Sequence, residues 1–71
     1  MINEEMKTAA IATNLETLEK VLYEAKAHSS EAVAAIRRGE KNEAIGATLC
    51  IEEMLRQAMA LYGAAIAIHR I

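Results

Sequence analysis

The C-terminal half of the chain carries two neighbouring stripes of apolar residues between positions 44 and 69. In each stripe the residues recur with alternating steps of three and four, the spacing that keeps side chains on one face of a helix. The first seam is Ala44, Ala47, Ile51, Met54, Ala58, Leu61, Ala65 and Ile68, and the second seam, one residue on, is Ile45, Thr48, Glu52, Leu55, Met59, Tyr62, Ile66 and His69. A helix with two adjacent seams is apolar over roughly half of its circumference, so it must be covered from two directions.

The N-terminal half carries one narrower stripe with the same spacing. Its members are Ile11, Leu15, Leu18, Leu22, Ala25, Ser29, Ala32 and Ile36. The helix has two candidate starts: Asn3 followed by acidic residues can cap it early, and the run Thr13-Asn14-Leu15-Glu16 can act as a capping box for a later start. Ser29 and Ser30 could also interrupt it, because serine competes for backbone hydrogen bonds, although Ser29 stays in register with the stripe.

A turn is expected directly after residue 38. Arg37 and Arg38 are followed by Gly39, the usual residue of a helix C-terminal cap, and Asn42 is expected to cap the next helix. Because so short a connection makes neighbouring helices antiparallel, the sequence predicts an all-α fold, an antiparallel two-helix hairpin. The predicted single domain covers residues 1–71, with helix 1 at about 3–38, a turn at 39–42 and helix 2 at about 43–70.

Helix 1 can cover only one seam of helix 2, and we expect it to cover the alanine-rich first seam. The packing residues on helix 1 would be Leu15, Leu18, Leu22 and Ile36. Each large apolar side chain of the second seam that stays in water forgoes roughly 1.5–3 kcal/mol, and several of them approach the total stability of a small domain. We therefore expect self-association into a helical bundle or binding to another protein. The predicted contact face is Ile45, Thr48, Leu55, Met59, Tyr62 and Ile66.

Composition narrows the class of protein further. The chain has 71 residues, a single cysteine and no proline, and its formal net charge is −2. One cysteine excludes an internal disulfide, and a negative net charge argues against binding to nucleic acid. The segment Met1–Lys7 has no secretory signal character, and the longest uncharged run, Ala58–His69, is about half of the ~20 residues that span a bilayer. We expect a cytoplasmic protein without a membrane segment.

No arrangement of reactive side chains predicts catalysis. His28 shares one helix face with two glutamates, as in metal-binding bundles, but the facing helix offers only Glu52 or Glu53 at a similar height. Cys50 has neither a histidine nor a basic residue at adjacent helical spacing, so an activated thiol is not expected. The sequence predicts no enzymatic activity, no cofactor and no metal site.

Two local motifs carry a resemblance to a known family. Arg38-Gly39 closes helix 1, and the run Ala64-Ala65-Ile66-Ala67-Ile68-His69 gives helix 2 an ending rich in alanine and isoleucine. Within an acidic hairpin of about this length, these motifs resemble the small helical-hairpin co-chaperones of bacterial type III secretion needle proteins. Helix 2 between the two motifs is longer here by about a heptad.

The resemblance implies a function in the cytoplasm. The hairpin would bind a larger chaperone built of tetratricopeptide repeats, and together they would hold the needle subunit as a monomer until export. The implied contact face lies chiefly on helix 2, at Leu55, Met59, Tyr62 and Ile66, with Ile45 and Thr48 at its rim. Two other interpretations remain open. One is a homodimeric regulator that binds RNA or DNA, for which the basic cluster is Arg37, Arg38 and Lys41, and the other is an inhibitor or antitoxin that wraps another protein.

Overall fold

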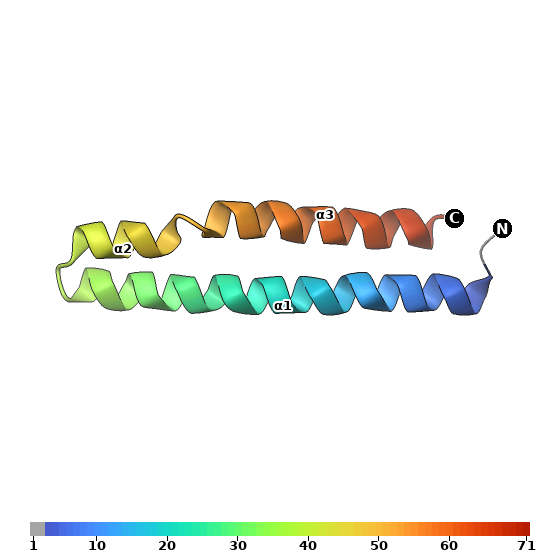
Figure 1. Cartoon of the computed structure of the whole chain (residues 1–71), viewed down its shortest axis with the longest axis horizontal. Helices are drawn as coiled ribbons and strands as arrows, with labels where there is room; N and C mark the ends of the chain where they lie inside the picture. Colours follow the sequence, from blue (N-terminus) through green and yellow to red (C-terminus); the bar gives the residue numbers. More distant parts are fainter. Residues whose placement is uncertain (1–2) are drawn as a thin grey trace.

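Two helical arms lie side by side and antiparallel in the computed structural model, which describes residues 3–71 (Figure 1). The first arm is α1 (Glu4–Arg37), and the second arm consists of α2 (Lys41–Thr48) and α3 (Ile51–His69). The Cα atoms extend over 56 × 14 × 11 Å, so the hairpin is a rod. The predicted all-α hairpin is confirmed for the described residues, whereas Met1 and Ile2, which the predicted domain includes, lie outside them.

The first arm is one uninterrupted helix that begins at its early cap. The Asn3 side chain accepts a hydrogen bond from the Met6 N–H at 2.7 Å, and two glutamates occupy the first turn, where negative charge is favourable. The later start at Thr13 is therefore wrong. The alternative break at the serines is also wrong, because the Ser29 hydroxyl donates to the Ala25 carbonyl at 3.0 Å and the helix continues beyond it.

The arms are joined by a tight helix C-terminal cap at Gly39, whose φ of +78° suits a residue without a Cβ. The Gly39 N–H donates to the Ile36 carbonyl and the Glu40 N–H to the Ala35 carbonyl, both at 3.0 Å, the double bond pattern of a Schellman motif. The predicted cap on the next helix is wrong. The chain turns helical again at once, with the Ala44 N–H donating to the Glu40 carbonyl, so Asn42 already lies inside α2.

The second arm bends between Thr48 and Ile51, so the predicted continuous helix over 43–70 is wrong (Figure 1). The Thr48 hydroxyl donates to the Ile45 carbonyl at 2.7 Å, the acceptor that the Leu49 N–H would use in an unbroken helix. The Leu49 N–H instead donates to the Gly46 carbonyl at 3.3 Å, a tighter turn. Regular pairing resumes when the Met54 N–H donates to the Cys50 carbonyl. The bend thus coincides with a side-chain hydrogen bond to a backbone carbonyl.

The first seam of the second arm faces α1, as predicted, since each of its eight residues is buried or half-buried. On α1, however, the inward stripe is Ile11, Asn14, Leu18, Val21, Ala25, His28, Ala32 and Ala35. The predicted inward positions of Leu15, Leu22 and Ile36 are wrong, because these side chains are 46–50% exposed. The alanines of the seam let the two helices approach closely, and the α1 residues buried at this approach are also alanines, Ala25 and Ala35.

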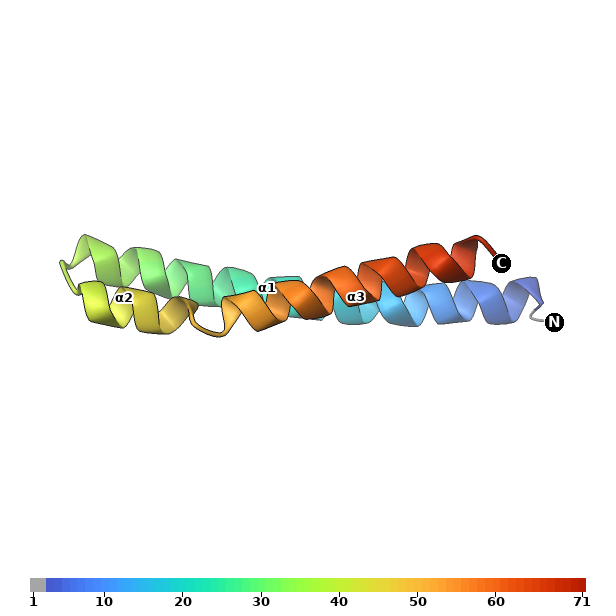
Figure 2. The ribbon, with the colours of Figure 1, turned by 90° about the horizontal axis from the view of Figure 1, so that it is seen from above.

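The hairpin has almost no core of large side chains. Its buried residues are Ala25, Ala35, Ala44, Ala58 and Ala65, and no large side chain is fully buried in the described part of the chain. The two arms cross at a shallow angle along the rod, as helices wound around one another do (Figure 2). This packing brings the backbones together but leaves much of the large apolar surface outside.

Candidate protein-interaction surface

The predicted contact residues lie along the outer part of the second arm, and most of them are exposed. The exposed fraction is 63% for Ile45, 50% for Leu55, 68% for Met59 and 52% for Tyr62. Thr48 and Ile66 are half-buried. The described structure therefore leaves the bulky part of the second seam without a cover from the chain itself.

Exposed leucines of α1 extend this surface onto the first arm. Leu15 and Leu22 directly follow inward residues of α1, as Leu55 and Tyr62 directly follow inward residues of α3. Two antiparallel helices are related by a twofold axis perpendicular to their common plane, so equivalent positions on them share one side of the pair. The four side chains therefore lie on the same side of the hairpin.

We call this side the apolar face. Its members are Leu15, Leu22, Val33 and Ile36 on the first arm, with Ile45, Leu55, Met59, Tyr62 and Ile66 on the second arm. Equal residue counts from the turn place Leu22 near the level of Leu55 and Leu15 near that of Tyr62. Sequence reasoning missed the α1 members because their spacing also fits an inward stripe. The signal that could have found them is the parallel series Val21, Ala25, Ala32 and Ala35, whose small residues match the alanines opposite.

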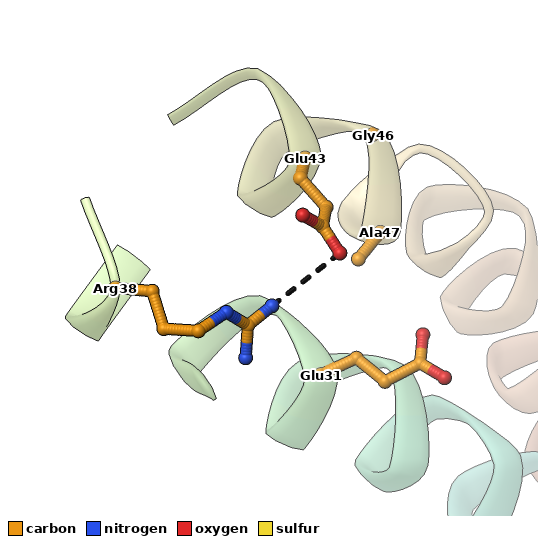
Figure 3. Close-up of a pocket in the computed structure, with 5 residues that line it drawn as sticks. All are labelled: Glu31, Arg38, Glu43, Gly46 and Ala47. Atoms are coloured by element: carbon orange, nitrogen blue, oxygen red, sulfur yellow. Dashed lines mark hydrogen bonds and ion pairs between the residues drawn. The ribbon is translucent and has the colours of Figure 1, made fainter. Parts of the chain in front are cut away.

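The other side of the seam is polar near the turn. Glu31 and Glu43 directly precede inward residues, and they line an open pocket with Arg38, Gly46 and Ala47. The Arg38 side chain extends from the end of the first arm toward Glu43 on α2, with Glu31 farther along α1 (Figure 3). Its Nη2 lies 3.4 Å from a Glu43 carboxylate oxygen. Charged side chains thus connect the two arms on this side.

Hydrogen bonds and charge shift three pKa values in the turn cluster of Arg38, Glu40 and Glu43. The Arg38 Nε donates to a Glu40 carboxylate oxygen at 2.7 Å, which raises the pKa of Arg38 and lowers the pKa of Glu40. The pKa of Glu43 is raised, chiefly by its hydrogen bond and charge repulsion with Glu40. The single guanidinium of Arg38 is thus shared between two carboxylates, and it joins the turn to the start of α2.

Chemistry-bearing side chains are dispersed over the rod. Between residues 3 and 71, no three histidine, cysteine or acidic side chains come close enough to hold a metal ion. His28 Nδ1 lies 3.7 Å from a Glu31 oxygen, and Cys50 is half-buried at the bend. Arg56 is paired with Glu52 and Glu53 on the surface of α3. These groups form local surface contacts and do not converge on one site.

The chain matches no protein-family model, and neither a curated protein nor a solved structure matches it significantly. None of the helices in the described part combines the length and the apolar character that crossing a bilayer requires. The feature that distinguishes this rod is the contrast between its two sides. One is polar and internally paired at the turn, and the other exposes large apolar side chains from both arms.

Proposed function

We propose that the protein is a chaperone that lays its apolar face over a helical surface of another protein. One observation carries the proposal: within residues 3–71 the fully buried residues are all alanines, while many large apolar side chains are exposed. Apolar patches of this kind on a small protein mark interaction sites. The face spans both arms, so a partner helix can lie lengthwise along the rod.

The side chains of the face suit a surface that must fit another protein. Met59 is flexible and polarizable, which lets it adapt to an irregular partner. Tyr62 offers a large ring for burial and a hydroxyl that can remain hydrated at the rim of an interface. Leu15, Leu22 and Leu55 add aliphatic area around them. The combination favours packing with a partner over specific chemistry on a small molecule.

The resemblance to needle co-chaperones supplies the class of partner. It rests on Arg38-Gly39 at the turn and on the segment 64–69 at the end of α3. In that role the partners are a tetratricopeptide-repeat chaperone and the needle subunit, both in the cytoplasm. A subunit that polymerises through helical surface stays monomeric while another protein covers that surface. An exposed apolar face on a rigid rod is what such a cover requires.

Affinity capture from the native host tests the proposal. The bait is the tagged full chain, compared with a variant that carries Met59→Glu and Tyr62→Glu on the face. The control carries Ala60→Glu and Ala67→Glu, which add the same charge to exposed positions on the outer side of α3. We expect the wild type and the control to retain a needle subunit and its repeat chaperone, and the face variant to lose them. Retention by all three baits would show that another surface binds, and capture of neither partner would refute the assigned role.

A further inference from the structure

We propose that a second copy of this chain covers the apolar face when no other partner is bound, in a dimer whose twofold axis runs parallel to the rod. The inference concerns the partner-free protein and goes beyond the proposed function. In this arrangement the two apolar faces meet, and the four arms form a four-helix bundle. Each α1 then lies against the second copy's α3, and these neighbours run antiparallel.

The centre of such a dimer consists of large apolar side chains. Because the axis is parallel to the rod, residues at the same distance from the turn meet at the same level in both copies. Leu22 and Leu55 of the two copies form one layer, and Leu15 and Tyr62 form the next layer toward the open end. These are the side chains that a single hairpin leaves exposed.

The edges of the two faces are complementary in the same register. The edge of α1 carries Ala12, Glu19, Lys26 and Val33, and the edge of the second arm carries Ile45, Glu52, Met59 and Ile66. Each edge residue of α1 lies as many residues from Gly39 as one edge residue of the second arm, so in the dimer it faces that residue of the second copy. The pairs are Val33 with Ile45, Lys26 with Glu52, Glu19 with Met59, and Ala12 with Ile66. Two pairs are apolar and one joins opposite charges, so three of the four match.

A dimer with its twofold axis across the rod matches less well. It would place α1 against the second copy's α1 in the opposite direction. When Leu15 and Leu22 of the two α1 helices are aligned, Glu19 then lies close to Glu19 of the second copy. Val33 would also face the polar start of the other α1. The parallel axis avoids both, and it lets the two faces overlap along the whole 56 Å length of the rod, as an interface of standard size (~800 Å² per partner) requires.

Charge reversal at the edges tests the pairing of Lys26 with Glu52. The two residues lie on opposite edges of one hairpin, so their attraction acts between copies. Because the dimer contains this contact twice, Lys26→Glu or Glu52→Lys should each weaken dimerisation about tenfold. The double swap should return the dissociation constant to within about threefold of the wild type. Sedimentation equilibrium of the full chain, at low salt, measures all four constants against the 7.7 kDa monomer.

Matched controls separate this contact from general charge effects. Lys20→Glu and Glu53→Lys make the same changes on the outer sides of the same helices, and Glu53→Lys also removes a contact with Arg56, as Glu52→Lys does. We expect both controls to dimerise like the wild type. A wild type that is monomeric at all concentrations tested would overturn the proposal, and so would control variants as weak as the edge variants. Far-UV circular dichroism confirms that each variant is helical.

Cysteine cross-linking tests the register of the dimer. In a Cys50→Ser background, Val33→Cys and Ile45→Cys are made as separate chains, mixed, and oxidised with oxidised glutathione. The parallel axis brings residue 33 beside residue 45 of the second copy, so the mixture should form a disulfide-linked dimer of the two variants. Each variant alone should stay reduced, because a dimer of two identical variant chains places its two cysteines on opposite edges. Cross-linking of either variant alone, with none in the mixture, would overturn this register.

The outcomes also distinguish the dimer from the proposed function. A dimer with the expected charge and cross-linking behaviour supports the inference even if no needle subunit is captured from the host. A monomer that captures those partners through Met59 and Tyr62 overturns the inference and leaves the proposed function standing. If both hold, the second copy and the partner compete for one face, and added partner should dissociate the dimer.

Discussion

Alanine at the interhelical seam sets how closely the two arms approach. Ala58 is 7% exposed and lies midway along α3, against the inward side of α1. We expect Ala58→Leu to force the arms apart and to lower the free energy of unfolding by about 1–3 kcal/mol, the usual cost of overpacking. Thermal denaturation followed by circular dichroism measures the change. Ala60→Leu, at an exposed position two residues on, is the control, and equal melting temperatures for the two variants would contradict a close seam.

Glycine has opposite effects at two positions of the chain. Gly39 has φ +78°, a conformation that costs other residues about 1–2 kcal/mol, so Gly39→Ala should destabilise the hairpin by roughly that amount. Gly63 lies inside α3, where a Cβ would meet no neighbouring atom within 4 Å, so Gly63→Ala should stabilise the helix by up to ~1 kcal/mol. Chemical denaturation of both variants checks the signs. A stabilising Gly39→Ala would show that the turn does not depend on the left-handed cap.

At the scale of elements, Glu40 and Glu43 of the turn cluster should make the stability of the fold depend on pH in opposite directions. The lowered pKa of Glu40 means that its ionised form is favoured by folding, so its stabilisation is present above the unfolded pKa and is lost as pH falls through the folded pKa. The raised pKa of Glu43 means the reverse: its contribution is present below the unfolded pKa and is lost as pH rises through the folded pKa.

The corresponding glutamine variants should therefore differ in sign at neutral pH. Glu40→Gln should lower the melting temperature, because an uncharged amide oxygen accepts the Arg38 hydrogen bond more weakly than a carboxylate does. Glu43→Gln should raise it, because it removes a carboxylate that Glu40 repels. Both differences should shrink as pH falls below the unfolded pKa of ~4.3, because the glutamates become protonated. Melting curves across this range make the test, and the same sign for both variants at pH 7 would contradict the pairing.

The helices and the turn show which parts of the fold could be predicted from the sequence. Asn3 and Gly39 act through bonds to nearby backbone groups, so the hairpin turn was predictable and the early start of α1 was one of two candidates. The bend was not, because threonine commonly sits in helices without breaking them. Thr17, whose hydroxyl donates to the Thr13 carbonyl within unbroken α1, shows this directly. The difference at Thr48 is a bond to a carbonyl three residues back instead of four.

At the scale of the molecule, the facing side of α1 was the main feature that the sequence left undetermined. The predicted and observed inward stripes share Ile11, Leu18, Ala25 and Ala32, and they differ by a small rotation of the helix. Which one faces the second arm depends on how closely the arms approach, a property of both arms together. The same rotation explains why the predicted contact face held only residues of the second arm, whereas Leu15 and Leu22 belong to the apolar face as well.

A hairpin whose fully buried residues, within the part that the structure describes, are all alanines should owe much of its stability to the molecule that covers its apolar face. If a second copy is the cover, the melting temperature of the wild type must rise with concentration. Each tenfold increase adds ~1.4 kcal/mol to the association, and for an unfolding unit of about 140 residues this corresponds to roughly 3–6 °C. The variant with Met59→Glu and Tyr62→Glu should melt lower and independently of concentration, since it cannot bury the face. Thermal denaturation followed by circular dichroism, at two protein concentrations tenfold apart, measures whether the melting temperature changes. A wild-type melting temperature that does not move would mean that the alanine seam and the turn suffice to hold one hairpin closed.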